Sequence, residues 1–193
     1  MKFVFFGTPE FAAIVLERLI KSSYKPLAEF RNPKESVSVL IEKLKNLKPD
    51  LAIIAAYGKI LPKEILDIPS RGFINVHPSL LPKYRGPSPI QAAILNGDKE
   101  TGVTIMKIDE KMDHGPVLAY SKWLIADSDT YETLSKKLAE LGAELLIKII
   151  PDYISGKLKP ITQDHSKATY TKIIKKEDGK INWLKSAGEI ERM

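Results

Sequence analysis

The chain has 193 residues, 44% of them hydrophobic, and 30 basic against 24 acidic side chains give a formal net charge of +6. This length and composition allow one sizeable core, and no apolar run approaches the roughly 20 residues that span a bilayer. The N-terminus lacks a signal-peptide pattern, and zero cysteines exclude disulfides, thiolate metal sites and a cysteine nucleophile, so we expect a cytoplasmic protein.

The first half of the chain alternates apolar runs of strand length with amphipathic segments. Continuous apolar runs predict buried strands at residues 2–6, 50–57 and 72–77. Thr8 as an N-cap and Pro9 at the first helical position predict that a helix follows the first strand. Residues 24–49 have room for one short extended piece and one helix, but not for a further strand–helix–strand unit.

The second half continues the alternation. Residues 88–97 (SPIQAAILNG) predict a helix that is capped at both ends. Two more strands are predicted at residues 101–108 and 117–125. Asp129 and Glu132 have the spacing of a capping box, which predicts a long amphipathic helix over residues 130–150. Strands that alternate with helices predict an α/β fold with an open, mostly parallel sheet and helices on both faces.

Two polar side chains, Asn75 and His77, end the apolar run at 72–77. They are two residues apart, so on an extended backbone both point to the same face. Ligands of open parallel sheets bind at the carboxyl ends of the strands. A lone histidine there is more often structural, but the paired asparagine favours a site. Further polar groups occur in a loop after a later strand, at Asp109, Glu110, Asp113 and His114, although such an acidic loop is by itself most often a solvated turn.

Asparagine, histidine and aspartate together suit the transfer of an acyl group to an amine, which passes through a tetrahedral oxyanion. The Asn75 amide and a cationic His77 can each donate a hydrogen bond to that oxygen, and one such donor is worth ~3 kcal/mol in the transition state. Asp113 can hold His77 protonated or receive the proton of the amine through water, a role worth roughly 10²–10⁴-fold in rate.

Other kinds of site fit the sequence less well. Ser79 lies near His77, but no G-x-S-x-G elbow is present. The histidines of the chain are His77, His114 and His165, and none shows zinc spacing. Residues 7–10 (GTPE) follow a strand and open a helix, yet they match neither a dinucleotide fingerprint nor a Walker sequence. We therefore expect neither a metal nor a nucleotide cofactor.

The positive charge is concentrated near the end of the chain. Residues 157–185 contain eight lysines and three acids, so +5 of the net charge lies there. Such a run is usually a solvated face. It suggests a polyanionic partner only if a site elsewhere points to one. A non-catalytic RNA-binding module is the alternative, but binding RNA does not require an Asn–His pair at a strand end.

A known family has these residues in the same order. The pattern Asn75-x-His77-x-Ser79-Leu80-Leu81-Pro82, followed by Asp113-x-Gly115-Pro116, resembles the 10-formyltetrahydrofolate-dependent formyltransferases. Within that superfamily the chain is most similar to the branch that acts on methionyl-tRNA. The similarity is carried by FFGTPEFA (5–12), AAYGKILP (55–62) and residues 84–109 and 168–183.

The resemblance implies a Rossmann-like monomer that transfers a formyl group from 10-formyltetrahydrofolate to the α-amine of methionyl-initiator-tRNA. Asn75, His77 and Asp113 would act without a metal or a covalent enzyme intermediate. The resemblance places the folate beside Ser79, Leu80, Leu81 and Pro82, with Tyr57 and Gly58 as another wall. It also places Phe11 near the methionine side chain, where a simple core residue is the alternative. Formylation of an amino sugar linked to a nucleotide is the competing activity.

The sequence departs from the family at three places. Residues 24–49 are too short for the second strand and the long basic loop of the family, and we expect a segment to be missing there. Residues 1–162 would form the catalytic domain, and residues 163–193 a basic extension leading to a C-terminal domain that this chain lacks. His114 occupies a position that often holds a smaller residue, so a second imidazole is expected beside the site.

Overall fold

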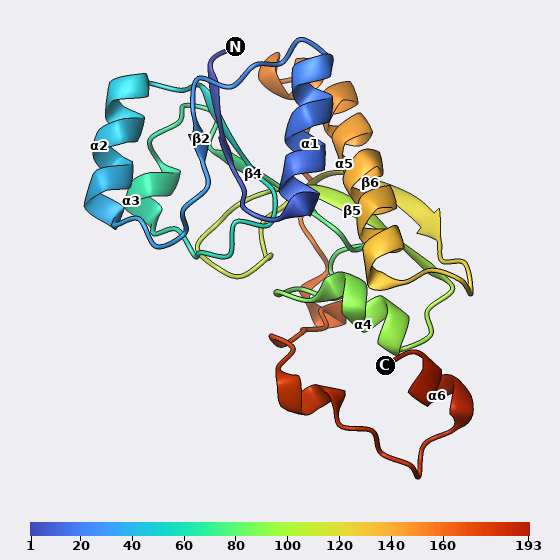
Figure 1. The fold of residues 1–193 in the computed structure, drawn as a ribbon. Coiled ribbons are helices and arrows are strands. Elements are labelled where there is room, and N and C mark those ends of the chain that lie inside the picture. Colours follow the sequence, from blue (N-terminus) through green and yellow to red (C-terminus); the bar gives the residue numbers. More distant parts are fainter.

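The computed structural model describes residues 1–193, which form one six-stranded sheet with helices on both faces (Figure 1). The strand order is β2-β1-β3-β4-β5-β6. The strands are β1 (Phe3–Phe6), β2 (Glu29–Phe30), β3 (Leu51–Ile54), β4 (Phe73–His77), β5 (Glu100–Lys107) and β6 (Val117–Leu124). From β2 to β4 all neighbours are parallel, whereas β5 is antiparallel to both β4 and β6. The prediction of a Rossmann-like, mostly parallel α/β sheet is therefore confirmed.

The helices form two layers. They are α1 (Glu10–Lys21), α2 (Val37–Leu47), α3 (Lys63–Leu66), α4 (Pro89–Leu95), α5 (Tyr131–Ile154) and α6 (Ala187–Glu191). Two 3₁₀ turns, η1 (His165–Lys167) and η2 (Lys176–Gly179), lie between α5 and α6. Figure 1 shows α1 and α5 together on one side of the sheet, with α2 and α3 on the other. None of these helices combines the length and the apolarity that crossing a bilayer requires.

Each central strand contributes to two hydrophobic cores, because successive side chains of a strand point to opposite faces. Phe3 and Phe5 of β1 pack in the core beneath α1 and α5. Val4 and Phe6 pack in the core beneath α2 and α3. In β4 the same alternation places Ile74 and Val76 beneath α1 and α5. Phe73 lies in the core on the α2–α3 side, and the strand alternation places Asn75 and His77 on that face with it.

Several predicted element boundaries differ from those observed. The hydroxyl of Thr8 donates to the carbonyl of Arg31, so Thr8 does not cap α1, and Pro9 occupies the N-cap without a side-chain bond. Ser88 likewise makes no capping bond to α4, and its N–H donates to the hydroxyl of Thr171 instead. The run at 50–57 forms a shorter strand, since Ala56 has a φ of 47° and the chain has already left the sheet.

The start of α5 lies one residue later than predicted. Thr130 is the N-cap, and it exchanges two hydrogen bonds with Thr133, so the capping box is formed by these two threonines. The helix also continues to Ile154, past Pro151. Asp129 lies just outside the helix, where its carboxylate accepts from the Ala126 N–H, from the Thr133 hydroxyl and from Lys137.

Replacing Asp129 with asparagine is expected to lower the free energy of unfolding by about 1–2 kcal/mol at pH 7. Burial alone would raise the pKa of Asp129, but hydrogen bonds from Lys137, Ala126 and Thr133 outweigh it and lower the pKa below its usual value. A lowered pKa stabilises the fold above the ordinary aspartate range, and that stability is lost as pH falls through the folded value. Denaturant titrations at pH 7 and pH 3 measure this.

Asp127 provides the matched control for that variant. Its ion pair with Lys99 is exposed at both ends, with side-chain exposures of 93% and 81%. Asp127→Asn should therefore change the midpoint of unfolding little. Equal losses in the two variants would contradict the structural role assigned to Asp129.

Residues 24–49 form the short extended piece and the single helix that the sequence predicts. The extended piece is β2, which pairs with β1 at the edge of the sheet. The helix is α2, and the hydroxyl of Ser36 caps it by accepting from the Val39 N–H. The sheet is continuous from β2 to β6.

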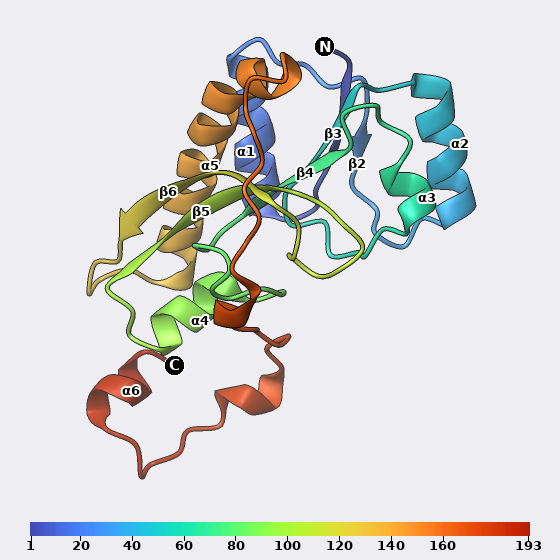
Figure 2. The ribbon, with the colours of Figure 1, turned by 180° about the vertical axis from the view of Figure 1, so that it is seen from behind.

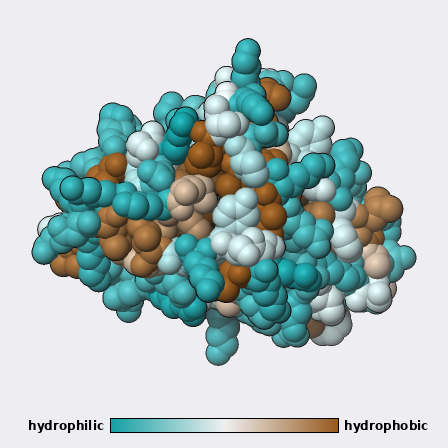
Figure 3. Space-filling view, turned by 90° about the horizontal axis from the view of Figure 1, so that it is seen from above, coloured by the Kyte–Doolittle hydropathy of each residue, from teal (hydrophilic) through white to brown (hydrophobic).

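After α5 the chain runs back along the sheet toward α4, where η1, η2 and α6 follow (Figure 2). Isolated bridges join this segment to the domain, pairing Ile161 with Val117 and Tyr170 with Arg85. Beyond Thr171 most side chains are exposed, including Trp183 at 79% and Leu184 at 95%. The opposite end of the molecule, where the chain begins, has a mainly hydrophilic surface with separate hydrophobic groups (Figure 3).

Candidate active site

The end of β4 presents Asn75 and His77 on one face of the sheet. Asn75 is half-buried. His77 is 4% exposed, and its Nε2 lies 3.0 Å from the carbonyl oxygen of Tyr84. A carbonyl only accepts, so Nε2 carries the proton and Nδ1 is the ring nitrogen that faces the site.

Asp113 reaches this face by an indirect path. β5 is antiparallel to β4, so the chain leaves β5 beside the start of β4, where the Ile108 N–H donates to the carbonyl of Phe73. The loop of residues 108–116 then returns along β4. It brings Oδ1 of Asp113 to 3.7 Å from Nδ1 of His77. The predicted convergence of Asp113 with His77 is therefore present in the structure.

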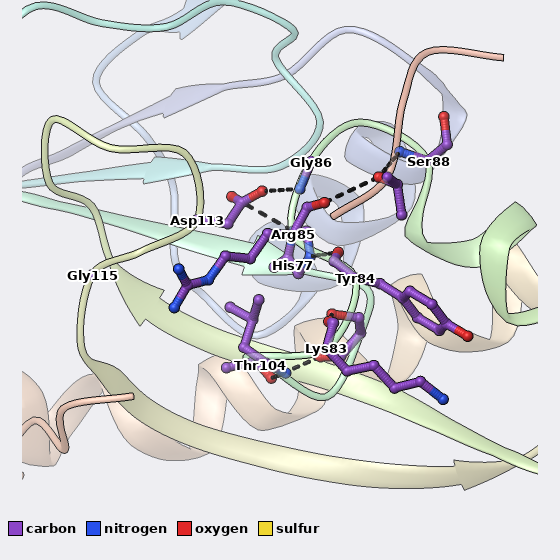
Figure 4. Close-up of polar contacts among 12 residues, drawn as sticks. His77, Lys83, Tyr84, Arg85, Gly86, Ser88, Thr104, Asp113 and Gly115 are labelled. Carbon is purple, nitrogen blue, oxygen red and sulfur yellow. Dashed lines mark hydrogen bonds and ion pairs between the residues drawn. The ribbon is translucent and has the colours of Figure 1, made fainter. Parts of the chain in front are cut away.

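A tight turn at Tyr84–Gly86 fixes the carboxylate of Asp113 from the other side. The Gly86 N–H donates to Oδ2 of Asp113 at 2.7 Å (Figure 4). Gly86 has a φ of 105°, and a Cβ there would lie 2.7 Å from the carbonyl oxygen of Thr171. The position thus requires glycine both for its backbone conformation and for space. One oxygen of Asp113 is held by the turn, and the other faces His77.

Internal hydrogen bonds hold the loop after β4, and only some of its backbone groups are available to bind a ligand. The Thr104 hydroxyl donates to the carbonyl of Ser79 and accepts from the Leu81 N–H. The Ser79 hydroxyl donates to the carbonyl of Lys83 at 2.6 Å, so Ser79 serves the loop and is not poised as a nucleophile. The Leu80 N–H and the Leu81 carbonyl have no partner within the chain. These two groups remain available to a ligand.

The other predicted site residues lie in the cores. Tyr57 is 2% exposed, packs edge-on against Phe6, and donates its hydroxyl to the carbonyl of Asn32. Burial, and to a lesser extent Glu35, raises the pKa of Tyr57. Phe11 is 5% exposed and belongs to the core beneath α1 and α5. Neither side chain makes a polar contact with Asn75 or His77.

A cavity of about 560 Å³ lies elsewhere, between β2 and α2. Neither Asn75 nor His77 lines it. Its charged lining side chains pair with one another, Arg31 with Glu29 and Lys43 with Glu35. The cavity therefore offers a ligand no unpaired charge from these residues, and the chemistry of the β4 face identifies the candidate site better than cavity size does.

Sequence reasoning missed a second group of polar residues behind the site. Arg85 is buried, and its guanidinium donates to the side chains of Gln163, His165 and Tyr170. Gln163 in turn donates to the backbone of the loop that carries Asp113. The sequence signal for this group was slight, because Gln163 lies in a segment without periodicity, far along the chain from Arg85.

His114 bonds to an acid of its own loop and stacks on the segment after α5. Its Nδ1 donates to Oδ2 of Asp109 at 2.7 Å, and its ring stacks on His165 with centroids 3.9 Å apart. Nδ1 of His165 accepts from Arg85 at 2.9 Å, an arrangement that requires a neutral imidazole. His114 therefore links the Asp113 loop to the segment after α5. No group of three or more His, Cys, Asp or Glu side chains with metal-binding geometry occurs in the chain.

Docking of residues 163–171 is expected to weaken as pH falls below about 6.5. Loss of hydration, together with the neighbouring charges of His114 and Arg85, lowers the pKa of His165, while Asp109 opposes this and Lys111 adds to it. A lowered histidine pKa stabilises the fold above the ordinary value, and that stability is lost as pH falls through it. Hydrogen-exchange protection factors of the Arg85 and Thr171 amides, which bond across this segment, report the change.

His165→Gln is the control, because an amide oxygen can accept from Arg85 but does not titrate in this range. Protection in that variant should be nearly constant between pH 7.5 and pH 5. The same loss of protection in both proteins would show that His165 is not its cause.

An imidazole and a carboxylate 3.7 Å apart, with an asparagine on the same face of the strand, suit an acyl-transfer enzyme on a Rossmann-like fold. The family model for formyl transferase matches residues 11–150. A methionyl-tRNA formyltransferase from Thermodesulfovibrio yellowstonii is 45% identical over 97% of this chain and 70% of its own length. The chain therefore belongs to the formyltransferase family, and the predicted enzyme class is confirmed.

Solved structures agree on the fold. HypX from Aquifex aeolicus in complex with tetrahydrofolic acid has a TM-score of 0.85 at 19% identity, covering 100% of this chain and 33% of that chain. Methionyl-tRNA formyltransferase from Clostridium thermocellum has a TM-score of 0.76 at 20% identity, covering 100% of this chain and 81% of that chain. The alignment to the Thermodesulfovibrio relative extends over 217 positions, more than the 193 residues of this chain, so the relative has positions without a counterpart here.

Proposed function

We propose that this chain transfers a formyl group from 10-formyltetrahydrofolate to the α-amine of methionyl-initiator-tRNA. The observation that supports the proposal is the approach of Asp113 to His77, which shares its strand face with Asn75, in a chain that is 45% identical to a methionyl-tRNA formyltransferase. The folate supplies the activated formyl carbon. The residues of this chain orient it, stabilise the charge that develops on its oxygen, and move a proton.

Asn75 and His77 act as hydrogen-bond donors to that oxygen. The Asn75 amide extends from the same strand face as His77 and is half-buried. Nε2 of His77 is already committed to the Tyr84 carbonyl, which leaves Nδ1 as the donor of the protonated ring. Oδ1 of the Asp113 carboxylate lies 3.7 Å from Nδ1. Two preorganised donors in a mostly buried site are the arrangement that oxyanion stabilisation requires.

Asp113 also suits proton transfer. The attacking amine loses a proton as its nitrogen bonds to the formyl carbon, and the departing folate nitrogen gains one as its bond to that carbon breaks. Oδ2 of Asp113 is held by Gly86, and Oδ1 can accept the amine proton through one water. His77 Nδ1 can return a proton to the leaving nitrogen. The balance closes without a covalent enzyme intermediate.

The loop after β4 fits the heterocycle of the folate. Leu80 offers a free N–H and Leu81 a free carbonyl, and the surrounding hydrogen bonds to Thr104 keep both groups in place. We place the folate along Ser79–Pro82 for this reason. Tyr57 would support the wall of the folate site from within the core, because its hydroxyl already donates to the carbonyl of Asn32. Phe11 can offer the methionine side chain only the small edge that remains exposed.

The acceptor assignment rests on the relative and on the basic extension. All eight lysines of residues 157–185 are exposed, and the extension starts beside the site, where residues 169–171 bond to the turn at 84–86. Lysines along an exposed segment suit the phosphates of a tRNA acceptor arm, and such contacts weaken steeply with salt. The extension therefore lies where a bound tRNA would deliver its aminoacyl end.

The test is an assay of formyl transfer from 10-formyltetrahydrofolate to two acceptors, charged initiator tRNA and a nucleotide-linked amino sugar. We expect formylation of the tRNA, with a KM that rises as salt is increased. Activity on the sugar with none on the tRNA would overturn the proposal and favour the competing acceptor.

A further inference from the structure

Arg85 is a buried cation without a carboxylate partner. It is 1% exposed, and its side-chain partners are all neutral acceptors: the amide oxygen of Gln163, Nδ1 of His165 and the hydroxyl of Tyr170. Burying an unpaired charge is costly unless every donor is well satisfied. In Figure 4 the Arg85 side chain extends beneath Asp113 toward the part of the loop that carries Gly115. This arrangement places the planar guanidinium, with its several N–H donors, behind the loop of residues 108–116 that carries Asp113.

Gln163 connects that guanidinium to the loop. Its Oε1 accepts from Nη2 and Nε of Arg85 at 2.7 and 3.2 Å. Its Nε2 donates to the carbonyl oxygens of Asp113 at 2.9 Å and Gly115 at 2.7 Å. A glutamine amide has two donor hydrogens and two acceptor lone pairs, and here all four are used. Gln163 is 6% exposed, so these bonds have little competition from water and fix the amide in one orientation.

The loop needs such support. Asp113 has a φ of 46°, a left-handed conformation that is unfavourable for a side-chain-bearing residue. At Gly115 a Cβ would lie 1.9 Å from the carbonyl oxygen of Lys107, so the backbone passes very close to β5. Strained backbone of this kind persists only when its surroundings hold it. The two carbonyls that Gln163 binds are those of Asp113 and Gly115, on either side of His114.

We propose that Gln163, oriented by Arg85, is a positioning residue for formyl transfer. It holds the backbone of Asp113 so that the carboxylate can reach both Gly86 and His77. The inference rests on the proposed role of Asp113 in the reaction. It also means that the first part of the segment after α5 completes the active site, although it is remote from β4 in the sequence.

The experiment compares Gln163→Leu and Gln163→Glu with the unmodified chain in the formyl-transfer assay. Gln163→Leu removes all four hydrogen bonds, whereas Gln163→Glu keeps an acceptor for Arg85 and loses the donors to the loop. Both are expected to lower kcat by about 10–100-fold, since a displacement of about 1 Å at a catalytic group costs that much. The KM for 10-formyltetrahydrofolate should change less than about threefold, because the Ser79–Pro82 loop is untouched.

Tyr153→Phe is the matched control. It removes another mostly buried hydrogen bond, from the Tyr153 hydroxyl to the carbonyl of Arg71 at 2.6 Å, which does not involve the catalytic loop. Its kcat should equal that of the unmodified chain. If Gln163→Leu does not fold, Gln163→Asn, which withdraws the same amide by one methylene, takes its place with the same expected loss.

A double variant separates this inference from the proposed function. If Gln163 acts through Asp113, adding Gln163→Leu to Asp113→Asn should slow the reaction no further than Asp113→Asn alone. Full activity of Asp113→Asn would show that the proposed role of Asp113 is wrong. Two results would overturn the positioning role of Gln163 while Asp113→Asn remains slow and the role of Asp113 stands. One is a kcat of Gln163→Leu within twofold of normal. The other is a double variant whose loss in kcat equals the product of the two single losses.

Discussion

Asp113→Asn is expected to lower the kcat of formyl transfer by about 10²–10⁴-fold, with little change in the KM for the folate. The substitution keeps the shape of the side chain and an oxygen for the Gly86 N–H. It removes the negative charge that faces Nδ1 of His77 at 3.7 Å and the acceptor for the amine proton. Steady-state kinetics with charged initiator tRNA as acceptor measure the loss.

Asp109→Asn is the matched control for this loop. Asp109 is an acid of the same loop, but its carboxylate pairs with His114 and does not reach His77. The control should retain most of its activity. A rate for Asp113→Asn within a few-fold of normal, or an equal loss in Asp109→Asn, would remove Asp113 from the mechanism.

Asn75→Ala is expected to cost about 10²–10³-fold in kcat, the usual effect of deleting one donor to a developing oxyanion. Asn75 is only half-buried, so its truncation should affect the stability of the fold much less than the rate. Rates from single-turnover experiments isolate the chemical step from product release.

Asn96→Ala serves for comparison, because it also removes an asparagine amide, one that donates to the hydroxyl of Tyr84 at 2.8 Å. That amide is not directed at the site, and kcat should stay near normal. If Asn75→Ala raised only the KM for the folate, Asn75 would be a binding residue and the oxyanion role would be wrong.

The Asn–His pair could be predicted because its geometry is local. Residues two apart in a strand share a face, so Asn75 and His77 had to project together once residues 72–77 were recognised as a strand. The buried parallel strands were equally readable from their unbroken apolar runs. Both predictions rest on a period that short sequences display directly.

The antiparallel pairing of β5 with β6 was not predicted, although a signal existed. The connection between β5 and β6 is residues 108–116, which is short for a crossover between parallel strands and suits a hairpin. Because β5 is antiparallel to β4, the chain leaves β5 at the end of the sheet away from His77. Asp113 reaches His77 only because the loop of residues 108–116 turns back along β4. The short helix α3 was missed because four residues show no helical period.

The hydrogen bonds that join Arg85 and Gln163 to the Asp113 loop could not be predicted from the sequence. Gln163 is 50 residues from Asp113 and 78 from Arg85, and glutamine has no positional preference that marks such a contact. Thr8 shows the same limit at a helix end, since it has the right residue type for a cap but its hydroxyl donates to the distant carbonyl of Arg31. Long-range hydrogen bonds can thus override local preferences.

Asn75, His77 and Asp113 are proposed to surround a single formyl carbonyl. A crystal structure of the chain with a stable formyl-folate analogue tests this arrangement. We expect the formyl oxygen within about 3 Å of the Asn75 amide nitrogen and within hydrogen-bond reach of Nδ1 of His77. We also expect the heterocycle to lie against the backbone of Leu80 and Leu81. An analogue bound in the cavity between β2 and α2, or with its formyl group turned away from Asn75, would contradict it.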